Sequence, residues 1–106
     1  MTIVQLLKNA RGTTICFRKL KKYCHGVYEF TENNGNAKDA VISIDLLKRT
    51  DPARVFLHEL LHRTYLDRSE YAILALERHM WTHSSQRERY LLYRTLFMRK
   101  WRTRTF

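Results

Sequence analysis

Long apolar stretches are missing from this sequence. No run reaches the roughly 18 consecutive apolar residues that a membrane-spanning helix needs, so a membrane is not an expected partner. The first residues, MTIVQLLKNARGTT, hold only a short apolar segment and no small-residue cleavage site, which argues against a secretory signal. These absences predict a cytoplasmic protein.

Cysteine, glycine and proline are also scarce, with two, three and one among 106 residues. Cys16 and Cys24 are separated by seven residues, which is too far for a Cys-x-x-Cys pair, so both are expected to be reduced thiols. No repeat, low-complexity stretch or linker interrupts the chain. Residues 1–106 are therefore predicted to form a single domain.

Acidic residues are few. Ten Asp and Glu face 20 Lys and Arg, which gives a formal net charge of +10. Residues 1–25 contain no acidic residue, and residues 84–106 contain Glu88 alone against seven Lys and Arg. Such ends attract polyanions, so weak nucleic-acid binding through the basic termini is one interpretation. A solubilising surface is the other, because no nucleic-acid-binding fold motif accompanies the charge.

Hydrophobic periodicity divides the chain into short strands and longer helices. The segments expected to be extended are 13–17, 27–30 and 40–45. The segments expected to be helical are 2–10, 52–64, 68–83 and 85–101. Asn and Gly at 33–36 are typical of a turn between the second and third strands. The predicted fold class is α+β, with a small antiparallel sheet of about three strands packed on a helical layer.

Local signals mark where three of these helices begin. Asp51-Pro52 is typical of a cap followed by proline at the first helical position. The segments 67–70 and 85–88 each have the spacing of a capping box. In the last helix an apolar stripe of Tyr90, Tyr93, Leu96, Phe97 and Trp101 is expected to face the core.

The sequence HELLH at 58–62 carries the chemistry. His58 and His62 stand four residues apart, so on a helix their imidazoles project from one face and can bind one zinc ion. Glu59 is placed to reach a water on that metal and to act as a general base. The alternative is a pair of surface histidines on an ordinary helix.

A third protein ligand is expected from the following helix, since catalytic zinc usually has three. Glu70 and Glu77 share one face of that helix. If the chain reverses near residue 66, Glu70 lies level with His62, and Glu77 lies deeper as an acceptor for a ligand imidazole. If instead Glu70 belongs to the capping box, Glu77 becomes the ligand. His79 and His83 are weaker candidates because they project away from this face.

These residues resemble the gluzincin branch of the zincin metallopeptidases. In that branch a His-Glu-x-x-His helix is followed by a helix that donates a glutamate, as HELLH at 58–62 and SEYAILALE at 69–77 are arranged here. The pattern is similar to minimal single-domain proteins of phages and prophages, which would place the protein in the cytoplasm of a host. The segment also resembles SprT-like metallopeptidases, but Arg68 stands where their third histidine is expected and Arg63 where zincins carry an uncharged residue.

This resemblance implies a zincin-like domain that uses Zn²⁺ to hydrolyse a peptide or protein substrate. The substrate would add as a strand along residues 40–45, and Tyr65, Tyr71 or His79 would assist the developing oxyanion. A second interpretation is a non-catalytic module that keeps the zincin scaffold and binds nucleic acid or protein through its basic surface. A third combines the two, as a peptidase brought to DNA-bound proteins by its charge.

Overall fold

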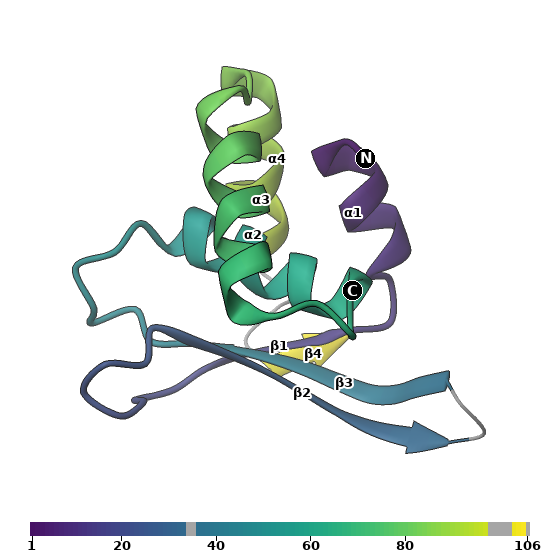
Figure 1. The fold of residues 1–106 in the computed structure, drawn as a ribbon. Helices are drawn as coiled ribbons and strands as arrows, with labels where there is room; N and C mark the ends of the chain where they lie inside the picture. Colours follow the sequence, from purple (N-terminus) through teal and green to yellow (C-terminus); the bar gives the residue numbers. More distant parts are fainter. Residues whose placement is uncertain (34–35, 98–102, 106) are drawn as a thin grey trace.

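The computed structural model describes residues 1–33, 36–97 and 103–105 (Figure 1). The elements in chain order are α1 (Ile3–Asn9), β1 (Thr14–Phe17), β2 (Gly26–Asn33), β3 (Asn36–Ile44), α2 (Pro52–Thr64), α3 (Glu70–Thr82), α4 (Gln86–Phe97) and β4 (Thr103–Thr105). The predicted turn at 33–36 has its two central residues outside the described part, as has the predicted helical stretch 98–101.

The described strands form one sheet in the order β2-β3-β1-β4. The hairpin β2–β3 is antiparallel, with Gly26 opposite Ile44, and β4 pairs antiparallel with β1. β1 and β3 are parallel, with Ile15 opposite Ile42. The predicted α+β class is confirmed, but the sheet is mixed and has a fourth strand. The parallel pair arises because the chain leaves β1, forms the outer strand β2, and returns as β3 between them.

The helices lie over one face of this sheet, and α2 is the one that lies directly on it (Figure 1). Phe56, Leu57, Leu60 and Leu61 are fully buried, as their arc on the helix predicted. They join Ile15, Ile42 and Ile44 from the sheet in one hydrophobic cluster. This packing fixes the opposite face of α2, which carries the HELLH polar residues, toward α3 and the edge of the sheet.

The expected stripe on α4 is only partly correct. Leu96 is fully buried as expected, and so is Leu92, which was not part of the expected stripe. Tyr90 and Phe97 are 61% and 47% exposed. Tyr93 is half-buried, and its hydroxyl donates to the Asp51 carboxylate at 2.5 and 2.6 Å. Trp101 lies outside the described residues. α4 therefore uses Tyr93 to hold the residue that caps α2.

Within the described residues, no helix combines the length and apolar character needed to cross a membrane.

Candidate metal centre

The helix α2 begins where its sequence signals predicted. Asp51 is the N-cap, and its side chain accepts a hydrogen bond from the backbone N–H of Ala53 at 3.0 Å. Pro52 occupies the first helical position, where its missing N–H costs nothing. Starting from this cap, Arg54, His58 and His62 recur every four residues and share one face of the helix.

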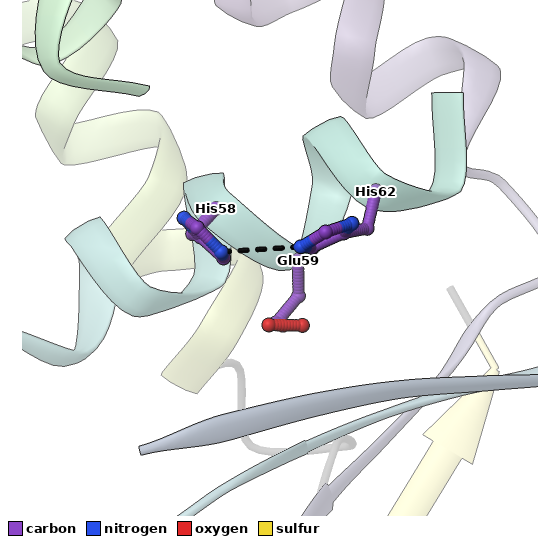
Figure 2. A group of neighbouring side chains, drawn as sticks. All are labelled: His58, Glu59 and His62. Atoms are coloured by element: carbon purple, nitrogen blue, oxygen red, sulfur yellow. Dashed lines mark hydrogen bonds between the residues drawn. The ribbon is translucent and has the colours of Figure 1, made fainter. Parts of the chain in front are cut away.

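The two histidines of the motif converge. Their Nε2 atoms lie 3.2 Å apart, and Figure 2 shows both rings on the same side of α2. Their side chains are 13% and 24% exposed. The i, i+4 spacing predicted this convergence, since the second imidazole stands one turn above the first.

Glu70 comes to the same point from α3. Its two carboxylate oxygens lie 2.7 Å from Nε2 of His58 and 2.6 Å from Nε2 of His62. The cap of α3 is Ser69, which accepts from the N–H of Ala72, so Glu70 is the first helical residue. The capping box expected at 67–70 is therefore wrong. Because Glu70 is not used to cap the helix, its side chain is free to lean toward the histidines.

Glu77 lies one level deeper on the same face of α3. Its side chain is 10% exposed, and Oε1 lies 3.5 Å from Nδ1 of His58, on the side of the ring away from Glu70. Oε2 accepts a hydrogen bond from Nε of Arg54 at 2.7 Å. Glu77 was expected on this face of α3 but farther along, beyond His58, and Arg54 was not expected at all. Its position four residues before His58, on the same helical face, is the signal that could have found it.

The residues present fit a zinc ion. Bonds of roughly 2.05 Å to two ligands of a tetrahedral ion place the ligand atoms about 3.3 Å apart, and the two Nε2 atoms are 3.2 Å apart. Two imidazole nitrogens and one carboxylate oxygen are a donor set that catalytic zinc commonly uses. His58, Glu59 and His62 each offer a donor atom, and these atoms lie within 4.8 Å of one another. The carboxylate of Glu70 lies at hydrogen-bond distance from both rings.

Glu59 is directed differently from its neighbours. Figure 2 shows its carboxylate pointing away from the two rings, toward the sheet. The residue is 5% exposed. Burial, with a smaller effect from the charge of Glu70, raises its pKa to about 7 from the usual 4.5. A carboxylate removed from water in this way is a better proton acceptor than an exposed one.

Gly26, the first residue of β2, lets the strand approach Glu59 closely. A Cβ at this position would lie 2.6 Å from Cγ1 of Val55 and 3.1 Å from Cγ of Glu59. Only a residue without a side chain fits such an approach. The strand and the helix thus enclose the Glu59 side chain between them.

Two open cavities meet at this centre. One, of about 580 Å³, is lined by residues that include His58, Glu77, Tyr23 and His25. The second, of about 340 Å³, is lined by Val27 and Tyr28 of β2 and by His62. Gly26, Glu59 and Glu70 line both. The candidate centre is therefore accessible to a ligand through both cavities.

Several sequence candidates lie elsewhere. Of the described residues, those lining the two cavities do not include Tyr65, Tyr71 or His79. Tyr71 is 84% exposed, and the rings of His79 and His83 face each other, with centroids 4.3 Å apart. The cavity walls carry Tyr23, His25 and Tyr28 instead, which sequence reasoning missed because the loop before β2 offers no local motif.

The strand expected to receive a substrate is also corrected. β3 contains residues 40–44 and is paired with β2 on one side and β1 on the other. A further strand cannot add to it. β2 is the edge strand next to the candidate centre, and its residues Gly26, Val27 and Tyr28 line the smaller cavity.

No protein-family model, curated protein or solved structure matches this chain. The zincin resemblance of the sequence therefore stays a prediction, and any function proposed for the chain depends on the geometry of this centre.

Proposed function

We propose that this chain is a zinc-dependent metallohydrolase, and specifically a metallopeptidase. The observation that carries the proposal is the meeting of three donor side chains, His58, His62 and Glu70, beside a buried fourth, Glu59. His58, His62 and Glu70 would hold the zinc ion. When bound, zinc acts as a Lewis acid that acidifies water and polarises a carbonyl oxygen.

In the proposed mechanism the carboxylates of Glu59 and Glu77 have different roles. Glu59 takes the proton from the attacking water and delivers it to the leaving amine. Glu77 favours the tautomer of His58 that carries its proton on Nδ1, which leaves the lone pair on Nε2 for the metal. Arg54 holds Glu77 in that position. A purely structural metal site has no use for a base in the position of Glu59.

A peptide is the substrate class that the surroundings favour. β2 is an edge strand, and an extended peptide can add to such an edge through main-chain hydrogen bonds. Gly26, Val27 and Tyr28 belong to this edge and line a cavity together with Glu59 and His62. A peptide paired with β2 would therefore pass the base and the metal ligands.

The first test is metal content. Purified wild-type protein should carry about one zinc ion per chain, and His58→Ala should lose it. His79→Ala is the matched control, because His79 is an exposed histidine on α3 that does not line either cavity. Equal zinc in wild type and His58→Ala would contradict the metal site.

The second test is hydrolysis of a fluorogenic peptide library. Glu59→Gln should keep the zinc and lower the rate at least about a hundredfold, because it removes the general base. Equal cleavage by wild type and Glu59→Gln would contradict the assigned role.

The formal charge of +10 supports a second candidate, a basic binding module that keeps this scaffold without catalysis. Zinc binding with no hydrolysis of any peptide, together with tight binding of nucleic acid, would favour it. A peptidase recruited to nucleic acid would show both properties. For the location we propose the cytoplasm, since Cys16 and Cys24 are free thiols, as a reducing compartment keeps them.

A further inference from the structure

Two loops form a strongly basic surface beside the larger cavity. Residues 18–25 connect β1 to β2, and residues 45–51 connect β3 to α2. Together they hold six of the chain's 20 Lys and Arg and two acidic residues, Asp45 and Asp51, whose carboxylates accept hydrogen bonds from backbone N–H groups. Both loops project from the same end of the sheet, at the left of Figure 1. We call them the two-loop surface; its basic residues are Arg18, Lys19, Lys21, Lys22, Lys48 and Arg49.

The two loops are tied together, so the surface is formed before any ligand arrives. Nζ of Lys48 donates hydrogen bonds to the carbonyl oxygens of Lys21 and Lys22 at 3.0 and 3.1 Å. The buried Asp45 carboxylate accepts from the N–H groups of Leu20 and Leu47, one from each loop, at 2.9 and 3.0 Å. Lys48 and Asp45 thus hold the two loops together.

The remaining cations face solvent. Arg18 pairs with Glu29 at 3.0 Å. Lys19, Lys21, Lys22 and Arg49 are exposed, and among the described side chains none of the four has a carboxylate within ion-pair distance. Four cations without an ion pair on one tied surface attract a ligand that carries several negative charges.

Apolar groups stand among these cations. Tyr23 is 88% exposed and lies beside Lys22, whose Nζ is 5.5 Å from the ring centroid. Leu46 and Leu47, in the other loop, are 46% and 85% exposed. An exposed aromatic ring between lysines is the combination with which proteins bind single-stranded nucleic acid, because the ring stacks on a base while the cations contact phosphates.

We propose that the two-loop surface binds single-stranded nucleic acid, with Lys19, Lys21, Lys22 and Arg49 on the phosphates and Tyr23 stacked on a base. Tyr23, His25 and Thr50 also line the larger cavity, so the bound strand passes the mouth of the candidate metal centre. The inference does not depend on the proposed function, since none of these residues is a metal ligand. It narrows the nucleic-acid contact from the two basic ends of the chain to these loops, the first of which belongs to the basic stretch 1–25.

An anionic bilayer is the competing ligand, since Leu47 and Tyr23 could enter it. The loop residues Tyr23, His25 and Thr50 line a cavity. A base of a flexible strand can enter a cavity and stack there, whereas the surface of a bilayer stays flat. The observations therefore favour nucleic acid.

The test is fluorescence anisotropy with a labelled oligomer of about 15 thymidines, at several salt concentrations. A variant with Lys21→Gln, Lys22→Gln and Arg49→Gln should lose at least tenfold in affinity at low salt. The slope of log affinity against log salt should fall by about 2, at about 0.7 per cation for a single strand. Lys8→Gln, Arg11→Gln and Arg87→Gln together are the matched control, because they remove three exposed cations elsewhere. This control should lose less than threefold.

Tyr23 separates stacking from charge. Tyr23→Ala should weaken binding about tenfold without changing the salt slope, while Tyr23→Phe keeps the affinity. Thermal unfolding of each variant shows that the fold is intact. Equal losses in the two triple variants, or no binding by wild type, would overturn the proposal. So would tighter binding to phosphatidylserine vesicles than to the oligomer, with dependence on Leu47→Ala.

Discussion

Arg54 donates a hydrogen bond from Nε to Oε2 of Glu77 at 2.7 Å. The other oxygen of that carboxylate lies 3.5 Å from Nδ1 of His58. The guanidinium therefore compensates a buried charge and at the same time holds it against the ring of a candidate metal ligand. Residues that orient a metal-binding histidine in this way commonly influence metal affinity without contacting the metal.

The first prediction follows from this contact. Arg54→Met should weaken zinc binding about tenfold or more, because Glu77 loses the partner that fixes its carboxylate. Arg78→Met, an exposed position on the same helix as Glu77, removes the same charge and should leave zinc affinity unchanged. Competition with a chromophoric chelator measures both variants. An unchanged affinity in Arg54→Met would mean that Glu77 holds its place without help.

The second prediction concerns the two glutamates of α3. Glu70→Ala should reduce zinc affinity more than Glu77→Ala, because Glu70 lies 2.6–2.7 Å from both Nε2 atoms and Glu77 faces only Nδ1 of His58. Removal of a residue that only hydrogen-bonds to a metal ligand typically lowers metal affinity by about 10- to 100-fold, and removal of a direct ligand should lower it further. Zinc titration of both variants by calorimetry gives the order, and the reverse order would assign Glu77 as the ligand.

The third prediction is a pH dependence of stability from Asp45. Hydrogen bonds from the backbone N–H groups of Leu20 and Leu47, with the charges of Lys48 and Lys19, lower the pKa of this carboxyl below 3.8 despite its burial. A carboxyl whose pKa is lower in the folded state than in the unfolded state stabilises the fold at pH values above its unfolded-state pKa. This contribution is lost as the pH falls through the folded-state pKa. Asp45→Asn should therefore be less stable than wild type at pH 7.

Urea unfolding of both proteins at a series of pH values measures this effect. The gap between wild type and Asp45→Asn should be constant from about pH 5 upward and should narrow below about pH 4. A gap that stays the same down to pH 2 would show that the charge of Asp45 contributes nothing and that only its shape matters.

The fourth prediction tests the close approach of β2 to α2. Gly26→Ala should destabilise the fold by about 1–3 kcal/mol, because the added Cβ would lie 2.6 Å from Cγ1 of Val55. Val55→Ala in the same chain removes the atom in the way and should recover part of the loss. Thermal unfolding of the two single variants and the double variant gives the coupling. Additive effects would mean that the strand shifts to make room for the new methyl group.

The parts of this fold that were predictable are those that depend on neighbouring residues. Asp51-Pro52 marked the start of α2, and Ser85 and Glu88 form the expected capping box, with reciprocal hydrogen bonds of 3.0 and 3.1 Å. The HELLH spacing placed His58 and His62 together, and the seven-residue spacing of Glu70 and Glu77 placed both on the face of α3 that meets His58. Each signal spans one or two helical turns.

The parts that were missed depend on residues far apart in the sequence. The alternation of residues 42–45 indicates a strand but not its neighbours, so the central place of β3 and its parallel partner could not be seen. β4 pairs with a strand about 90 residues earlier, and its sequence carries no strand pattern that separates it from the preceding helix. His25 reaches the cavity through the course of a loop, for which the sequence has no periodicity.

The candidate metal ligands and the surroundings of Glu59 come from different parts of the sequence. The candidate metal ligands all lie between His58 and Glu70, on two consecutive helices, so the proposed metal site comes from one continuous segment. The surroundings of Glu59 depend on Gly26, more than 30 residues upstream and in another layer. Under the proposed function, metal binding and proton transfer would therefore depend on different parts of the chain. A substitution at Gly26 would disturb the surroundings of Glu59 and leave the three proposed metal ligands in place, so one change would be enough to give a metal-binding protein without activity.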